Sequence, residues 1–182
     1  MAIYFQKDDE NRTVLEAARH IANAARTAPK ARGMDNLVIA VADADELPAI
    51  AQTMMQLYEE GKAADFFVRD AHNLMVSQAL LLIGTKIKVL GLNCGLCGFD
   101  TCAEKNEYKN VPCAYNLNDL GIAMGSAVSR AADMRLDNRV MYSVGTAARE
   151  MKLLGEDVAV VFGLPLAAAS KSPYYDRKFT IK

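Results

Sequence analysis

Four cysteines are the residues of this chain whose type and spacing could do chemistry. They are Cys94, Cys97, Cys102 and Cys113, in the pattern C-x2-C-x4-C-x10-C, and the chain holds no others. Thiolates are the usual ligands of soft metal centres, and iron–sulfur clusters are typically held by four of them. The spacing therefore predicts a shared metal centre on all four cysteines. A complete set of four ligands favours a [4Fe-4S] cluster.

Two other interpretations of the cysteines stay open. Structural zinc also accepts four cysteines, but zinc ribbons present two separate C-x2–4-C pairs, and of the successive pairs Cys94/Cys97 and Cys102/Cys113 only the first has that spacing. The third interpretation is a set of metal-free cysteines, either reduced or joined in disulfides. A cluster with all its irons ligated leaves no open site for a substrate, which favours electron transfer over catalysis at the metal.

The composition is that of a globular protein. The chain has 182 residues, 52% of them hydrophobic, a net charge of -1 and no Trp. Nucleic-acid binding needs basic charge and usually aromatic faces, so we expect none. The N-terminus becomes charged from Lys7 onward, unlike a secretory signal, and the longest apolar stretch, 158–169, falls short of the ~20 residues of a membrane span. We expect a cytoplasmic protein without membrane contact, in which disulfides are rare.

Hydrophobic periodicity predicts the elements that must position the cysteines. Thr13 with Glu16, and Asp43 with Glu46, match the capping box that begins a helix. The apolar run 37–42 has the pattern of a strand buried on both faces. We expect helices over 14–26, 46–60, 65–74, 117–134 and 142–154, strands over 37–42, 76–85 (with an extension over 87–90) and 158–163, and a basic tail over 171–182.

This order of elements predicts an α+β fold, with helices on both faces of a sheet. We expect a single domain, 1–182, in which 91–115 is an inserted ferredoxin-like segment that binds the cluster. Gly121, Gly125 and Ser129 form a small-residue stripe on the helix 117–134, which favours tight helix packing over contact with a cofactor. The mixed charges over 130–139 indicate a solvated helix end.

Three segments together carry a resemblance to a known family. They are AARTAPKARGMDN, GLNCGLCGFDTC and GIAMGSAVSRAADMRLDNRVMYSVGTAAREM. The chain resembles a family of uncharacterised prokaryotic proteins described as containing a ferredoxin domain. The cysteine motif is also similar to the four-cysteine domains of corrinoid iron–sulfur proteins and of electron-transport-complex B subunits, with a shorter gap before Cys113. Both resemblances imply an iron–sulfur cluster.

A fainter resemblance is to the nitroreductase-like fold. It rests on Ala28-Pro29 after the first helix, a strand preceded by Asn36, a long Gly/Ala-rich helix and a Gly-Leu-Pro after a strand. This resemblance implies a homodimer that binds FMN between its subunits. In that family an Arg-Arg-Ser near the start of the chain grips the flavin phosphate. The cations that this chain offers nearby are Arg26, Lys30 and Arg32.

Three functional hypotheses follow from these residues. The first is an iron–sulfur protein that exchanges electrons with a redox protein partner. The second is an oxidoreductase in which the cluster feeds a bound flavin. The third is an interaction module stabilised by zinc.

Overall fold

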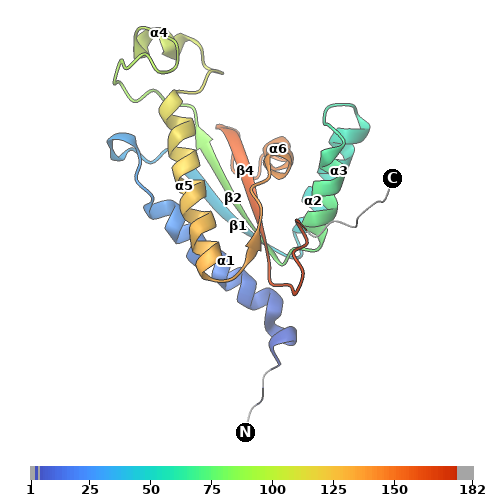
Figure 1. Cartoon of the computed structure of the whole chain (residues 1–182). Coiled ribbons are helices and arrows are strands. Elements are labelled where there is room, and N and C mark those ends of the chain that lie inside the picture. The colour runs from blue at the N-terminus through green and yellow to red at the C-terminus, as the bar shows by residue number, and fades with distance from the viewer. Residues whose placement is uncertain (1–2, 4, 176–182) are drawn as a thin grey trace.

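Four strands form one antiparallel sheet at the centre of the molecule (Figure 1). The computed structural model describes residues 3 and 5–175, and residues 176–182 of the expected basic tail lie outside this range. The spatial order is β1-β2-β4-β3, and every neighbouring pair is antiparallel. The strands are β1 (Leu37–Asp43), β2 (Ala79–Lys86), β3 (Asp137–Asn138) and β4 (Val158–Ala167).

Helices cover both faces of this sheet, as the sequence predicts (Figure 1). One face carries α1 (Glu10–Thr27) and α5 (Ala114–Asp133), and the other carries α2 (Leu47–Glu59), α3 (Phe66–Met75) and α6 (Tyr142–Glu150). Short 3-10 turns lie at Gln6–Asp9 (η1) and Ala31–Gly33 (η2). The short helix α4 (Cys102–Glu107) lies beyond one end of the sheet. Among the described helices, none is both long and apolar enough to cross a membrane.

The alternation of side chains along β2 divides the core in two. Leu81 and Ile83 pack with α1 and α5, whereas Leu80 and Leu82 pack with α2, α3 and α6. Successive residues of a strand point to opposite faces, so an unbroken apolar run supplies both layers at once. These two layers confirm the predicted α+β sandwich.

Two glycines let α6 lie directly against β4. A Cβ on Gly145 would fall 1.8 Å from the carbonyl oxygen of Val161, and one on Gly163 would fall 2.4 Å from Cγ1 of Val144. Neither position has room for a larger side chain without movement of its neighbour. The close approach of α6 to the sheet therefore depends on these two residues.

Several predicted boundaries are wrong. Helix α1 begins at Glu10, after the turn η1, so Thr13 and Glu16 lie inside it and form no cap. Helix α2 is preceded by Glu46, and Asp43 ends β1 instead of capping it. Strand β2 begins three residues later than predicted, and 87–90 do not extend it. Helix α5 begins at Ala114 and α6 ends at Glu150.

Strand β4 is longer than predicted because it continues through Pro165. The N–H of Gly163 bonds to Met141, so the nitrogen of Pro165 faces the same side of the strand. On that side the neighbouring chain pairs with Ala167 and Leu166 through Asp137 and Asn138, and with Gly163 through Met141, which leaves a gap at Pro165 where no N–H is needed. This gap is the kind of position where a strand tolerates proline.

Two predictions about packing are also wrong. Strand β1 lies at the edge of the sheet, and most of its residues are half-buried instead of buried on both faces. Gly121, Gly125 and Ser129 lie on the exposed side of α5, where a Cβ on either glycine would meet no atom within 4 Å. The contact between α5 and α1 is made by the adjacent stripe, which includes Ala123, Ala127 and Ser126.

Candidate metal centre

The cysteine segment, residues 87–113, joins β2 to α5 at one end of the sheet. Its two ends are fixed to the body of the protein. The buried side chain of Asn116 accepts a hydrogen bond from the Lys88 N–H at 2.9 Å through its Oδ1, and Cys113 is the residue that precedes α5. The guanidinium of Arg32 donates to the carbonyl of Leu90. The segment therefore leaves and re-enters the body at defined positions.

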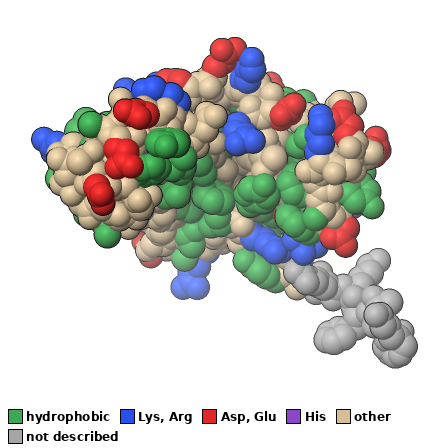
Figure 2. All heavy atoms as spheres, turned by 90° about the horizontal axis from the view of Figure 1, so that it is seen from above, with side chains coloured by type: hydrophobic (Ala, Val, Ile, Leu, Met, Phe, Trp, Pro, Cys, Tyr) green, Lys and Arg blue, Asp and Glu red, His purple; other side chains and the backbone are tan. Residues whose placement is uncertain are grey.

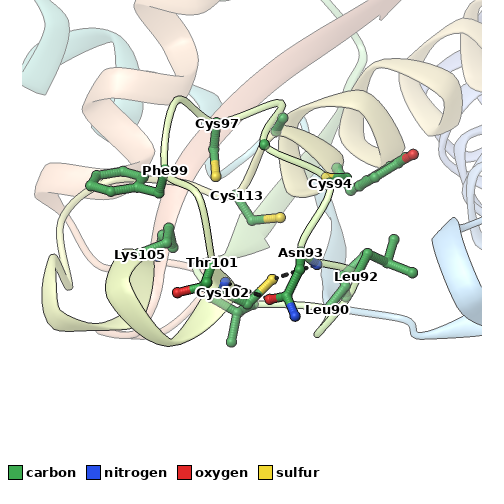
Figure 3. Close-up of a pocket in the computed structure, with 14 residues that line it drawn as sticks. Leu90, Leu92, Asn93, Cys94, Cys97, Phe99, Thr101, Cys102, Lys105 and Cys113 are labelled. Carbon is green, nitrogen blue, oxygen red and sulfur yellow. Dashed lines mark hydrogen bonds between the residues drawn. The ribbon is translucent and has the colours of Figure 1, made fainter.

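All four cysteines line one pocket within this segment (Figure 3). Their sulfur atoms lie on different sides of a common space, and none is in a disulfide. Cys94 is exposed, Cys97 and Cys102 are half-buried, and Cys113 is buried. The rest of the lining is largely apolar and includes Leu90, Leu92, Phe99 and Tyr115. The fold thus brings together the four residues that the sequence singled out.

The donor set fits a thiolate-ligated centre. Among the described residues that line the pocket there is no Asp, Glu or His, so cysteine sulfur is the ligand type on offer. As they stand, no three His, Cys, Asp or Glu side chains in the described chain converge closely enough to hold a single ion. A zinc ion would need each sulfur about 2.3 Å away. Binding of a single ion therefore requires the sulfurs to move within this segment.

Cys102 lies in a cradle of backbone N–H groups. The Asn93 N–H donates to its Sγ at 3.4 Å, and the Cys102 N–H donates in return to Oδ1 of Asn93 at 2.8 Å (Figure 3). Asn93 and Gly91 both adopt positive φ in this tight loop around the thiol. The Asn93 N–H is the largest cause that lowers the pKa of Cys102, with smaller contributions from Gly91, Leu92 and the charge of Lys105 against the opposing effect of burial. Such N–H···S bonds stabilise a thiolate and tune the potential of a cluster.

Helix α4 was not predicted, although the sequence carries its signal. Thr101 precedes the helix and accepts the Glu104 N–H at 3.1 Å, and the carboxylate of Glu104 accepts the Asp100 N–H at 3.3 Å. Thr101-x-x-Glu104 is a capping-box pattern, which places Cys102 in the first turn of the helix. Lys105, on the same helix, was also missed and is only 2% exposed.

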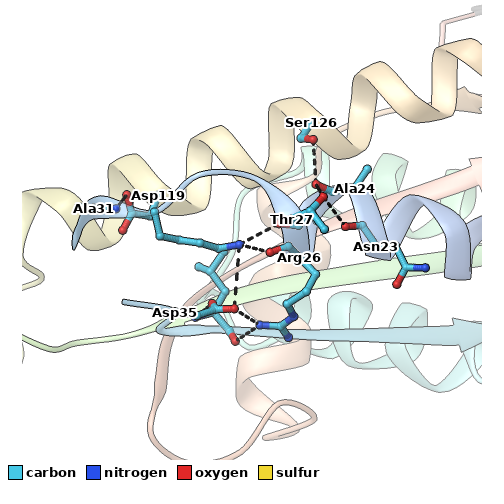
Figure 4. Close-up of polar contacts among 11 residues, drawn as sticks. Asn23, Ala24, Arg26, Thr27, Ala31, Asp35, Asp119 and Ser126 are labelled. Atoms are coloured by element: carbon cyan, nitrogen blue, oxygen red, sulfur yellow. Dashed lines mark hydrogen bonds and ion pairs between the residues drawn. The ribbon is translucent and has the colours of Figure 1, made fainter. Parts of the chain in front are cut away.

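The three candidate flavin-phosphate ligands make contacts within the chain. Arg26 donates to Oδ2 of Asp35 at 2.5 Å and to the Leu37 carbonyl at 3.2 Å (Figure 4). Lys30 donates to carbonyls in the last turn of α1, and its Nζ lies 4.0 Å from Asp35. Burial opposes the ionisation of Asp35, but the hydrogen bonds and charges of these partners lower its pKa.

Arg32 is directed away from the other two cations, to the Leu90 carbonyl of the cysteine segment. The N–H of Ala31 donates to Oδ1 of Asp119 on α5 at 3.1 Å (Figure 4). These contacts attach the loop 28–36 to α5 and to the cysteine segment. Arg26, Lys30 and Arg32 do not form a common phosphate cradle in this arrangement.

Solved structures of similar fold include a nitroreductase family protein and two proteins described as flavin-containing. A nitroreductase family protein from Clostridium novyi NT has a TM-score of 0.60 and 16% identity, covering 84% of this chain and 73% of its own. A BluB-like flavoprotein from Clostridium difficile 630 has a TM-score of 0.56 and 21% identity, covering 92% and 89%. An oxidoreductase described as containing FMN has a TM-score of 0.58 and 16% identity, covering 86% and 67%. The likeness shows that the fold is nitroreductase-like.

Sequence comparison indicates the family. An uncharacterized protein from Archaeoglobus fulgidus is 43% identical over 180 residues, which cover 94% of this chain and 96% of the relative. Residues 109–177 match the model of a family described as "Uncharacterized protein containing a ferredoxin domain". Of the four cysteines, this range includes Cys113 alone. The chain belongs to this family of uncharacterised ferredoxin-domain proteins.

Proposed function

We propose that this protein transfers electrons through a [4Fe-4S] cluster bound by Cys94, Cys97, Cys102 and Cys113. The observation that carries the proposal is the apolar pocket lined by four free thiols and by no other metal-ligand side chain among its described residues. Membership of a family described as containing a ferredoxin domain supports it. When bound, the cluster would supply one-electron transfer. Free thiols suit a reducing compartment, and we place the protein in the cytoplasm.

The other residues around the pocket would have different roles. The N–H groups at Gly91, Leu92 and Asn93 stabilise the thiolate of Cys102, and buried Leu90 helps to exclude water. Cys94 is the exposed cysteine, beside Leu92 and Leu96, which are 42% and 66% exposed. Figure 2 views the molecule from the end that carries this segment and shows hydrophobic side chains gathered between charges of both signs. We propose that a redox protein docks over the Cys94 edge, where the path for an electron is shortest.

Metal analysis of protein purified without oxygen tests this proposal. We expect about four iron and four sulfide per chain and broad visible absorption, and both should fall steeply when Cys97 or Cys102 is changed to Ser. Leu96→Ser is the matched control, because this exposed residue lies between Cys94 and Cys97 and ligates nothing in the proposal. Stoichiometric zinc without any capacity to assemble iron would refute the cluster and favour a zinc-stabilised interaction module.

A second candidate is a flavin-dependent oxidoreductase fed by the cluster, with FMN between two subunits of a homodimer. The fold supports it, since two of the similar structures are named as a flavoprotein or as containing FMN. Arg26, Lys30 and Arg32 each donate to a group of the chain itself, which does not favour flavin binding at these residues. Purified protein that carries releasable FMN and sediments as a dimer would support this candidate. Protein with an intact cluster and no measurable FMN binding would exclude it.

A further inference from the structure

Lys105 is an unusual residue in the wall of the cysteine pocket. Of the described residues that line the pocket, it alone is a Lys, Arg, Asp, Glu or His (Figure 3). Its side chain is 2% exposed, whereas Glu104 and Glu107 on the same helix face solvent. The Lys105 N–H bonds to the Thr101 carbonyl at 3.1 Å, so the position of the residue is tied to the capped start of α4.

This lysine has no acidic partner within the described part of the chain. The ion pairs found there involve other residues, and no hydrogen bond of its ammonium is seen. Shielding an ammonium group from water is unfavourable unless an opposite charge compensates it. The groups nearby that can become negative are the four cysteine thiols, which line the same pocket as Lys105.

We propose that Lys105 is the internal counter-ion of the metal centre held by the four cysteines and raises its reduction potential. The inference rests on the proposed function, because it needs a redox-active centre at these residues. Four thiolates give such a centre net negative charge, and reduction adds to it one electron from an external donor. Lys105 keeps its proton and no bond forms or breaks at it. A fixed positive charge nearby favours the more negative, reduced state.

The low solvent exposure of Lys105 distinguishes its proposed role as a counter-ion from the effect of a charge on the surface. Salt screens exposed charges over about a Debye length but acts weakly on charges that water does not reach. Lys109 belongs to the same segment and is exposed, so it provides a matched control. Removal of either charge changes the net charge equally, and only the shielded charge should set the potential strongly.

The test is a redox titration with dithionite and mediators, followed by optical and EPR spectra. Lys105→Met should lower the equilibrium constant for reduction at least tenfold, about 59 mV for one electron, at both low and high salt. Lys105→Arg should stay within about threefold of the wild type, because it keeps the charge. Lys109→Met should change the constant less than about threefold, and less still at high salt.

Each outcome decides the question. A Lys105→Met protein with full iron content and an unchanged potential overturns the counter-ion and leaves the proposed function intact. If Lys105→Met assembles no centre, Lys105→Gln and Lys105→Arg are compared. Assembly of the centre in Lys105→Arg but not in Lys105→Gln supports a need for positive charge at this position. Failure of all three variants to assemble a centre overturns the counter-ion. A wild-type protein that never acquires a redox-active metal removes the proposed function and this inference together.

Discussion

The body of the protein and its cysteine segment are built on opposite principles. In the body, side chains from β1, β2 and β4 and from the five helices α1, α2, α3, α5 and α6 pack into two apolar layers around the sheet. In the segment 87–113, most residues are exposed, the one helix has six residues, and the buried side chains include a lysine and a cysteine. Burial of apolar side chains can account for the stability of the body. The segment buries few side chains and gains little stability in this way.

This difference indicates two sources of stability. The body should fold without metal, because hydrophobic burial grows with the apolar area it encloses. The segment relies on a few polar contacts, such as those at Asn93 and Thr101, and on whatever the four thiols bind. Damage to one region should therefore leave the other largely unchanged.

The largest effect is expected for Gly145→Ala in the body. The new Cβ would overlap the backbone carbonyl of Val161, which cannot rotate away as a side chain could. Either α6 must shift away from β4 or the strand must bend, and we expect a loss of about 3 kcal/mol in the free energy of unfolding. Urea denaturation of the metal-free protein measures it.

Gly121→Ala is the matched control for this substitution. It makes the same change in a helix, at a site where the Cβ meets no atom within 4 Å. Alanine is the better helix former, so we expect a gain of about 0.5–1 kcal/mol. Equal losses at the two glycines would show that the close contact between α6 and β4 does not hold in solution.

The same contrast explains what the sequence could predict. The layers follow from apolar periodicity, which is why helices on both faces and the strands β1 and β2 were predicted close to their true positions. Boundaries failed where a local signal competed with that pattern. Thr13 and Glu16 match a capping box, yet the helix continues past them to Glu10 because nothing in the preceding residues stops it.

Inside the segment the situation is reversed. No periodicity marks α4, and its true signal is the same capping pattern at Thr101 and Glu104. Cysteine spacing was sufficient to group the four thiols, since ligand type and spacing are visible in sequence. The burial of Lys105 could not be predicted from sequence, because it results from how the loop folds over the pocket. Residues placed by loop geometry alone leave no repeating pattern to read.

Metal removal should have the next largest effect, and only in the segment. We expect hydrogen exchange of amides in 87–113 to speed up at least about tenfold when the metal is removed anaerobically by a chelator, because the thiols lose their common ligand. Amides of β2 and α5 should change less than about twofold. Measurement by mass spectrometry on both forms tests this, and equal loosening of the sheet would show that the metal stabilises the whole fold.

Alkaline pH should weaken the body through Tyr174. Burial raises the pKa of this tyrosine, and the charge of Asp137 adds to the effect. The unfolded chain loses the phenol proton near pH 10 while the folded chain retains it, so this residue stabilises the fold fully below pH ~10 and loses its contribution as the pH rises further. The free energy of unfolding should fall by up to about 1.4 kcal/mol per pH unit above pH 10.

Tyr174→Phe should remove that slope. The Tyr174 hydroxyl is hydrogen-bonded to Ser77 Oγ at 2.9 Å, and loss of this bond at pH 7 should cost about 1 kcal/mol. Urea midpoints from pH 7 to pH 11 measure both effects. Tyr58→Phe, at a residue that is 43% exposed, should keep the wild-type slope. A slope that survives in Tyr174→Phe would assign alkaline sensitivity to another group.

The smallest effect is expected for Thr101→Val in the cysteine segment. Valine keeps the shape of threonine but cannot accept the Glu104 N–H, so α4 loses its cap at a cost of about 1 kcal/mol. Because that helix carries Cys102 and Lys105, the amide of Glu104 should exchange about fivefold faster in the metal-loaded protein, while the unfolding of the body stays unchanged. Thr101→Ser retains the hydroxyl and should behave as the wild type. If Thr101→Val lowers the stability of the body as much as it loosens α4, the two regions form a single cooperative unit, and the division between them is only one of composition.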